Sequence, residues 1–179
     1  MKPSTPSEEL AARQSWSGPT LAEGVLTAEL AQFCQSGVSV VLASCDRRGR
    51  PVVGRGLACR IGDRGETRIV LRQPSNTTVL QALANGAGLA VTFTQPSTHR
   101  SIQLKAAGAT VAAPGVSDGP AVAVQTAGFR SELVARGYPE TFAVAFTAFE
   151  PHELAAVDFV PEHAFVQTPG PSAGSALRP

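Results

Sequence analysis

Three apolar runs joined by short polar turns constrain the fold of this chain more than any other feature of its sequence. The runs cover residues 38–45, 51–61 and 67–71. The first is rich in β-branched residues, and the turns between the runs have the sequences DRRG and DRGE. Such runs, separated by Gly- and Asp-containing turns, are typical of strands joined by hairpins. The sequence therefore predicts three consecutive strands in an antiparallel meander.

A helix is expected before the first strand. Thr20 and Glu23 have the spacing of a capping box, in which each side chain bonds a backbone N–H at the helix start. Apolar residues follow at helical spacing, and Gly37 fits the left-handed position that ends many helices.

Shorter elements follow the meander. Residues 75–86 fit a short helix that opens with hydroxyl side chains, and residues 121–136 fit a longer helix. Further strands are predicted at 89–94, 101–111 and 154–160, while 141–149 fits either a helix or a strand. Many short strands with few helices favour a mainly β (α+β) domain, an antiparallel barrel with helices at its ends.

The length of 179 residues fits one domain. We expect it to span residues 20–166, between a flexible tail at 1–19 and a Pro/Gly-rich tail at 167–179 without regular structure.

Composition excludes several classes of function. The formal charge of +1 comes without a basic block, which argues against a nucleic-acid partner. No apolar stretch is long enough to cross a membrane, and the N-terminus lacks the apolar core of a secretory signal. We therefore expect a cytoplasmic protein.

The three cysteines suggest neither a disulfide framework nor a zinc site, and the three histidines form no metal pair by local spacing. The cysteines are expected to be small buried hydrophobes.

Four stretches carry a resemblance to a known family. They are VSVVLASCDRRGRPVVGRGLACRI at 38–61, LRQPSNTTVLQALANG at 71–86, GLAVTFTQPSTHRSIQLKAAGATV at 88–111 and FVQTPGPSAG at 165–174. Together they resemble the pyridoxamine-5′-phosphate-oxidase-like, flavin-binding split-barrel family. The resemblance implies a six-stranded antiparallel split β-barrel that forms a homodimer and binds FMN in a cleft between its subunits.

The resemblance also implies residues that hold the FMN phosphate. Arg55 lies on the second predicted strand, where the family often places an arginine, and a guanidinium offers forked donors to phosphate. Its neighbours Gly54 and Gly56 would let a ligand approach the backbone. The alternative is a solvent-facing arginine on a bulged strand. Ser75, Asn76 and Thr77 lie at the family's phosphate-binding junction, although they would serve equally as an ordinary helix cap.

Two further sets complete the candidate site. The oxidase itself has a lysine two residues after its serine, where this chain has Thr77, so Arg72 or Lys105 would have to supply the missing charge. The segment Arg100-Ser101-Ile102-Gln103-Leu104-Lys105 resembles the family's fifth-strand signature. There Gln103 would bond the flavin ring and Lys105 its phosphate or pyrimidine edge. The alternative is the polar outer face of an ordinary strand.

The leading hypothesis is an FMN-binding split-barrel protein, a flavin-dependent oxidoreductase of unknown substrate. The oxidase's C-terminal substrate signature has no match in this chain, which argues against pyridoxamine phosphate oxidase activity. No residue stands out as a catalytic acid or base. Alternatives are an F420-dependent reductase, a non-catalytic haem- or flavin-binding module, and a dimeric scaffold without a ligand.

Overall fold

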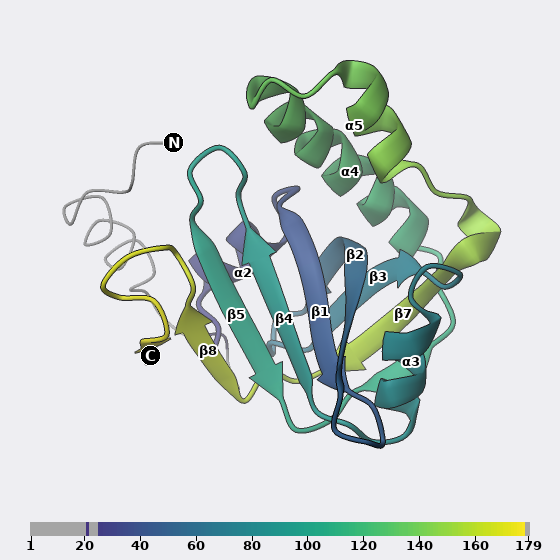
Figure 1. The fold of residues 1–179 in the computed structure, drawn as a ribbon, viewed down its shortest axis with the longest axis vertical. Coiled ribbons are helices and arrows are strands. Elements are labelled where there is room, and N and C mark those ends of the chain that lie inside the picture. The colour runs from purple at the N-terminus through teal and green to yellow at the C-terminus, as the bar shows by residue number, and fades with distance from the viewer. Residues whose placement is uncertain (1–20, 22–24, 178–179) are drawn as a thin grey trace.

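The computed structural model describes residues 21 and 25–177. Within them the chain forms one antiparallel sheet with helices on both of its faces (Figure 1). The strands are β1 (Ser39–Cys45), β2 (Pro51–Ile61), β3 (Thr67–Arg72), β4 (Leu89–Thr94), β5 (Ser101–Ala106), β6 (Thr110–Ala112), β7 (Leu154–Phe159), β8 (His163–Val166) and β9 (Ala176–Leu177). The helices are α2 (Ala28–Cys34), α3 (Thr77–Ala84), α4 (Asp118–Ala135) and α5 (Glu140–Thr147), with a 3-10 turn at Pro151–Glu153.

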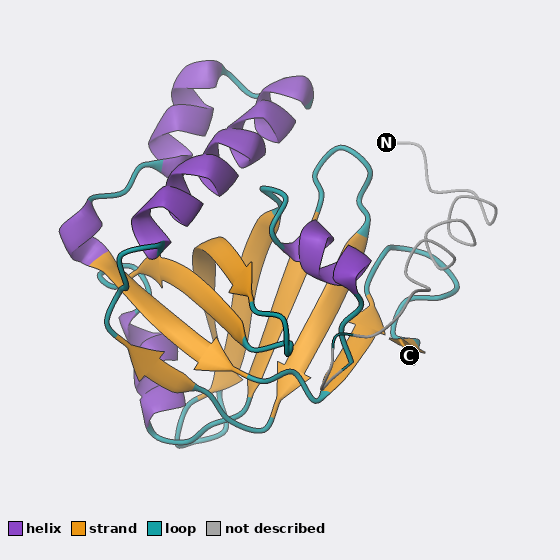
Figure 2. Cartoon of the chain, turned by 180° about the vertical axis from the view of Figure 1, so that it is seen from behind, coloured by secondary structure: helices purple, strands orange, loops and turns teal. Residues whose placement is uncertain are grey.

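The strand order across the sheet is β6-β7-β3-β2-β1-β4-β5-β8-β9, and every neighbouring pair is antiparallel. The sheet is strongly curved (Figure 2), but within the described residues β6 and β9 remain unpaired edges. The predicted mainly antiparallel α+β class is therefore confirmed. The six-stranded barrel is not, because β6, β8 and β9 extend the sheet beyond six strands and no pairing between described strands closes it.

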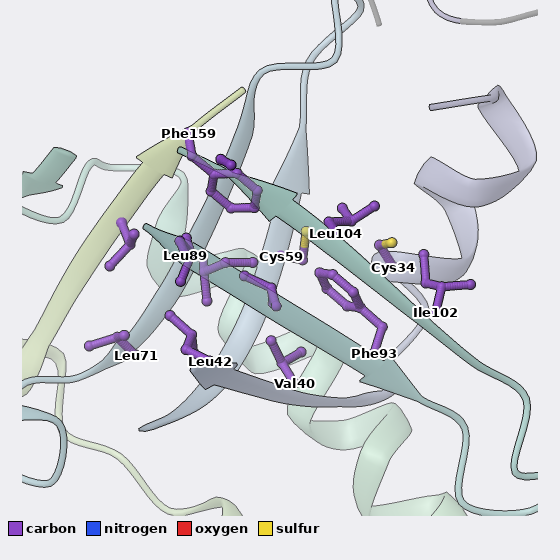
Figure 3. Packing of buried hydrophobic residues seen from close by; sticks show 14 of the residues in the cluster. Cys34, Val40, Leu42, Cys59, Leu71, Leu89, Phe93, Ile102, Leu104 and Phe159 are labelled. Atoms are coloured by element: carbon purple, nitrogen blue, oxygen red, sulfur yellow. The ribbon is translucent and has the colours of Figure 1, made fainter. Parts of the chain in front are cut away.

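The main core lies on the concave face of the sheet. Side chains from β1, β4 and β5 meet those from β2, β3 and β7 there, and α2 and α3 pack against them. Figure 3 shows Phe93 of β4 beside Val40, Ile102 and Leu104 in this cluster. Ile102 and Leu104 are fully buried, as the alternation along the strand predicts. A smaller cluster between α4 and the opposite face includes Ala58, Val70 and Val122.

Several predicted elements needed correction. The single strand expected at 101–111 is two strands, since β5 pairs with β4 and β8 whereas β6 pairs with β7 near the opposite edge. The ambiguous segment 141–149 is mostly helical, in α5. Strand β8 was not predicted, and the C-terminal tail contains β9, which pairs with β8.

The start of the first helix also differs from the expectation. The predicted capping box of Thr20 and Glu23 lies outside the described residues. Helix α2 instead begins after Thr27, whose hydroxyl accepts a hydrogen bond from the Leu30 N–H at 3.2 Å. Gly37 follows the helix with φ +79°, which matches the predicted left-handed residue.

The cysteine prediction holds for two residues of three. Cys34 and Cys59 are buried in the core, where burial raises the pKa of both thiols, whereas Cys45 is exposed at the end of β1. In the described part of the chain, the helices are too short or too polar to cross a membrane.

Candidate functional site

Arg55 lies in the middle of β2 on the convex face of the sheet. Its guanidinium carbon lies 3.9 Å from the centre of the Phe146 ring, and its Nη2 donates a hydrogen bond to the Phe146 carbonyl. Burial lowers the pKa of Arg55, and the nearby positive charge of Arg72 lowers it further. Arg55 forms no ion pair with any described residue. The site therefore contains a partly buried cation without an anionic partner.

The glycines beside Arg55 make room for protein atoms. A Cβ at Gly54 would lie 2.4 Å from Asn76 Oδ1, and one at Gly56 would lie 2.8 Å from a methyl carbon of Val40. Both positions therefore face packed side chains on the core side of β2. The start of α3 and the core fill the space beside these glycines, so the expectation that they admit a ligand there is wrong.

Asn76 joins the start of α3 to β2 and β3. Its Oδ1 accepts from the Arg55 backbone N–H at 2.8 Å, and its Nδ2 donates to the carbonyls of Arg72 at 2.7 Å and Arg55 at 3.2 Å. The side chain makes no capping bond to α3 and is buried. Asn76 therefore holds the loop in place and has little capacity left for a ligand.

Ser75 and Thr77 differ from Asn76 because both are exposed. The Ser75 hydroxyl makes a long hydrogen bond of 3.4 Å to the Arg72 carbonyl. Thr77 is the first residue of α3, whose first N–H groups have no partner within the helix. Hydroxyls and free N–H groups at a helix start can bind an anion.

Arg72 ends β3 and is already paired. Its guanidinium donates to both carboxylate oxygens of Glu153, at 2.9 and 3.3 Å. This bond is the largest cause that lowers the pKa of Glu153. Arg72 thus contributes positive charge next to Arg55, while most of its own charge is balanced by Glu153.

The three candidates on or just before β5 are Arg100, Gln103 and Lys105, and they do not all lie on the same face of the sheet. Arg55 pairs with Val41, Val41 with Thr92, and Thr92 with Gln103, so Gln103 lies in the same row across the sheet as Arg55. Directly paired residues point to the same face, so both side chains lie on the convex side. Gln103 Nε2 donates to the Thr92 hydroxyl at 3.1 Å.

Lys105 shares this face, and Arg100 does not. The Lys105 ammonium lies 4.8 Å from the centre of the Phe165 ring, on the neighbouring strand β8. Arg100 instead contacts α2, through an ion pair to Glu29 at 3.3 Å and the ring of Phe33 at 5.1 Å. Helix α2 packs on the core side, so Arg100 lies apart from the other candidates.

A row of three aromatic residues was not predicted: Tyr138 lies just before α5, and Phe142 and Phe146 lie within it. We call it the aromatic row of α5. Tyr138, Phe142 and Phe146 stack in series with ring centroids 5.3 and 5.4 Å apart, and the Arg55 guanidinium covers the last ring. All three rings are exposed, at 50%, 43% and 39%. The four-residue spacing of these aromatics was the signal in the sequence, because residues four apart are neighbours on a helix face, as Phe142 and Phe146 are on α5.

Arg55, Gln103 and Lys105 share the convex face, and the start of α3 is held next to Arg55 by the bonds of Asn76 to the Arg55 backbone. This surface offers cationic donors, hydroxyls and aromatic rings, which suit a ligand with an anionic group and a planar part. In the described residues it holds no nucleophile–base pair and no cluster of metal ligands.

No family model matches the chain, and no curated protein matches it. Among solved structures it is similar to HupZ from group A Streptococcus, with a TM-score of 0.49 and 16% identity over 83% of this chain and 99% of that one. A conserved hypothetical protein from Mycobacterium tuberculosis has a TM-score of 0.49 and 16% identity, over 83% of this chain and 89% of that one. A pyridoxamine 5′-phosphate oxidase-related, FMN binding protein from Nostoc punctiforme has a TM-score of 0.43 and 13% identity, over 79% of this chain and 82% of that one.

Proposed function

We propose that this chain is an FMN-binding protein of the split-barrel type that acts as a flavin-dependent oxidoreductase. The observation that carries the proposal is the charge state around Arg55. Its guanidinium is partly buried, has no ion pair among the described residues and lies close to the positive charge of Arg72. A phosphate there would offset both the burial and the repulsion.

The start of α3 supplies the remaining phosphate donors in this proposal. Ser75 and Thr77 are exposed next to the strand that carries Arg55, and Asn76 holds that loop against β2. A helix start favours an anion because its first N–H groups lack partners within the helix. These donors take the place of the lysine that this chain lacks.

Gln103 is the proposed contact of the flavin ring. It lies three strands from Arg55 in the same row, which corresponds to about 14 Å at the usual strand spacing. Its Nε2 is bonded to Thr92, which leaves its carbonyl oxygen to accept from a ring N–H. Lys105 lies on the same face, two residues further along β5. The bound flavin would supply the electron-transfer chemistry, while these residues bind and orient it.

A second copy of the chain would complete the cleft. Val41 and Val53 are exposed on the same convex face, and the aromatic row of α5 continues that apolar surface. Contiguous apolar surface of this kind is typical of an interface between subunits. The proposal therefore includes a homodimer, with the cofactor between the two copies.

Titration of the purified protein with FMN tests the proposal. We expect saturable binding, and we expect Arg55→Ala to weaken it by roughly 2–4 kcal/mol, because a charge-assisted phosphate contact is lost. Isothermal calorimetry measures the affinity, and a thermal melt checks that the variant is folded. Arg48→Ala, at an exposed arginine in the β1–β2 turn, is the matched control and should bind as the original chain does.

Parallel titrations with F420 and haem distinguish the alternative cofactors. Tight binding of F420 with the same dependence on Arg55 would assign the site to a deazaflavin. Haem binding with the same affinity in the original chain and in Arg55→Ala would favour the non-catalytic module. FMN binding that is undetectable, or that survives Arg55→Ala unchanged, would overturn the proposal.

A further inference from the structure

A second cleft lies at the end of β2, β3, β6 and β7, away from the convex surface around Arg55. We call it the end cleft; its volume is about 810 Å³. Arg60, which lines it, is five residues beyond Arg55 on β2, or about 16 Å along the strand. The lining residues are Gln35, Arg60, Ile61, Gly62, Glu66, Thr67, Arg68, Gly108, Ala109, Thr110, Asp158, Phe159 and Val160. Clefts of this size suit small molecules.

Most polar side chains of the end cleft are already bonded to the protein. Arg68 donates to Asp118, to Asp158 and to the Ala113 carbonyl through all three of its nitrogens. The Gln35 amide accepts from the Ile61 N–H and donates to the Ala31 carbonyl. Such groups support the cleft but offer few hydrogen bonds to a ligand.

Arg60 and Thr110 are different. Arg60 donates from Nη1 to Asp118 at 2.9 Å, whereas its Nε and Nη2 make no hydrogen bond to any described residue. The Thr110 hydroxyl is likewise unbonded within the described chain, three strands from Arg60 in the row Arg60–Arg68–Asp158–Thr110. The groups that remain for a ligand are therefore two cationic donors and a hydroxyl.

The charges around the end cleft largely cancel. Arg60 and Arg68 are matched by Asp118 and Asp158, and Glu66 is the remaining charged residue of the lining. An anion therefore gains no net attraction, and a cation would have to approach two guanidinium groups. An uncharged ligand fits this balance best.

The rest of the wall is apolar. Ile61, Ala109 and Phe159 line the cleft and also contact the core, and Val160 is 55% exposed beside them. Phe159 reaches from β7 into the core cluster (Figure 3), so the floor of the cleft is continuous with the core. Apolar walls with a few converging polar groups are the usual form of a small-molecule site.

We propose that the end cleft binds an uncharged small molecule with an apolar body and one carbonyl-type oxygen. Arg60 lies on the α4 side of the sheet and Ile61 on the core side, so the ligand spans the strand ends that the cleft surrounds. Its apolar body lies against Ile61, Ala109 and Phe159, and its oxygen accepts hydrogen bonds from Arg60. This site is separate from the flavin site and does not depend on it.

The solvent-sensitive dye prodan tests the proposal, because it is an uncharged naphthalene with one ketone oxygen. We expect saturable binding with a blue-shifted emission. Arg60→Lys keeps a positive charge beside Asp118 but removes the spare guanidinium donors, so binding should weaken by about tenfold. Gly108→Phe should abolish binding, since a side chain there meets no protein atom within 4 Å of its Cβ and can extend into the cleft.

Three controls identify the site that binds the dye. Arg48→Lys, in the exposed β1–β2 turn, should leave the affinity unchanged, and so should excess FMN. Phe142→Ser tests the exposed aromatic row of α5 as the competing dye site. Loss of the signal in Phe142→Ser, its displacement by FMN, or equal binding by Gly108→Phe would each overturn the proposal, provided that thermal melts show folded variants.

Discussion

Asn76 shows how much one buried side chain can determine around a site. It stands at the start of α3, where the sequence suggests a cap or a phosphate ligand, yet its amide bonds the backbones of β2 and β3. Those bonds position the exposed hydroxyls of Ser75 and Thr77. The residue that shapes the candidate site is thus distinct from the residues that are free to bind there.

Replacing Asn76 should destabilise the fold. Asn76→Ala leaves the Arg55 N–H and two carbonyls without their partner in a buried position, which should lower the free energy of unfolding by about 2–3 kcal/mol. Urea denaturation measures it. Ser75→Ala, one residue earlier and exposed, should change it by at most about 0.5 kcal/mol. Similar losses in the two variants would contradict the role assigned to Asn76.

At the scale of elements, an ion-pair network fastens α4 to the sheet. Asp118 begins α4, and its fully buried carboxylate accepts from Arg60 on β2, Arg68 on β3 and the Gly115 N–H. Burial alone would raise the pKa of Asp118, but these hydrogen bonds outweigh it and hold the pKa below its usual value. Because the folded pKa is lower than the unfolded one, the ionised carboxylate stabilises the fold above the unfolded pKa.

Removing this charge should change the pH dependence of stability. The stabilisation by Asp118 is present above its unfolded pKa of about 4 and is lost as the pH falls through the lowered folded pKa. We expect Asp118→Asn to lower the free energy of unfolding by about 3 kcal/mol near neutral pH, because Arg60 loses its anionic partner and Arg68 keeps only Asp158. The difference in free energy of unfolding between Asp118→Asn and the original chain should become smaller below pH 4.

Urea unfolding between pH 3 and 7 measures both quantities. Asp63→Asn is the matched control, since Asp63 is exposed in the β2–β3 turn. A difference between Asp118→Asn and the original chain that stays constant over this range would contradict the assignment, because it would show that the carboxylate does not titrate with folding.

The elements also show where local patterns fail. The run 101–111 has continuous strand character, yet Gly108 lies between β5 and β6, which pair near opposite edges of the sheet. Strand propensity describes how a segment fits a pleated surface and does not specify which partner it has.

Helix α5 was ambiguous for a related reason. Its sequence is mostly apolar, with only Ala143 and Thr147 buried, so no regular alternation marks one face.

For the whole molecule, the convex face predicts association. Val53 is 69% exposed and lies two residues from Arg55 on the same face. If a second copy covers this face, Val53→Glu should convert a dimer into a monomer, because it places a charge in an apolar interface. Sedimentation equilibrium at micromolar concentrations measures the mass.

Val116 provides the control for this prediction. It is 97% exposed in the loop before α4, so Val116→Glu adds the same charge to the same residue type outside the strands that carry Val41 and Val53. That variant should remain dimeric. The proposed homodimer would be wrong if the original chain is a monomer, or if Val53→Glu and Val116→Glu dissociate equally.

The sequence by itself determined the meander, most helices and the buried alternation of Ile102 and Leu104, because these depend on short-range periodicity and turn residues. It also placed Arg55 on the second strand. Only the tertiary structure decided that Gly54 and Gly56 accommodate packed side chains, that Arg72 is neutralised by Glu153, and that Arg100 faces α2. Those outcomes depend on contacts between segments far apart in the chain. No local pattern encodes which distant group will fill a space or balance a charge.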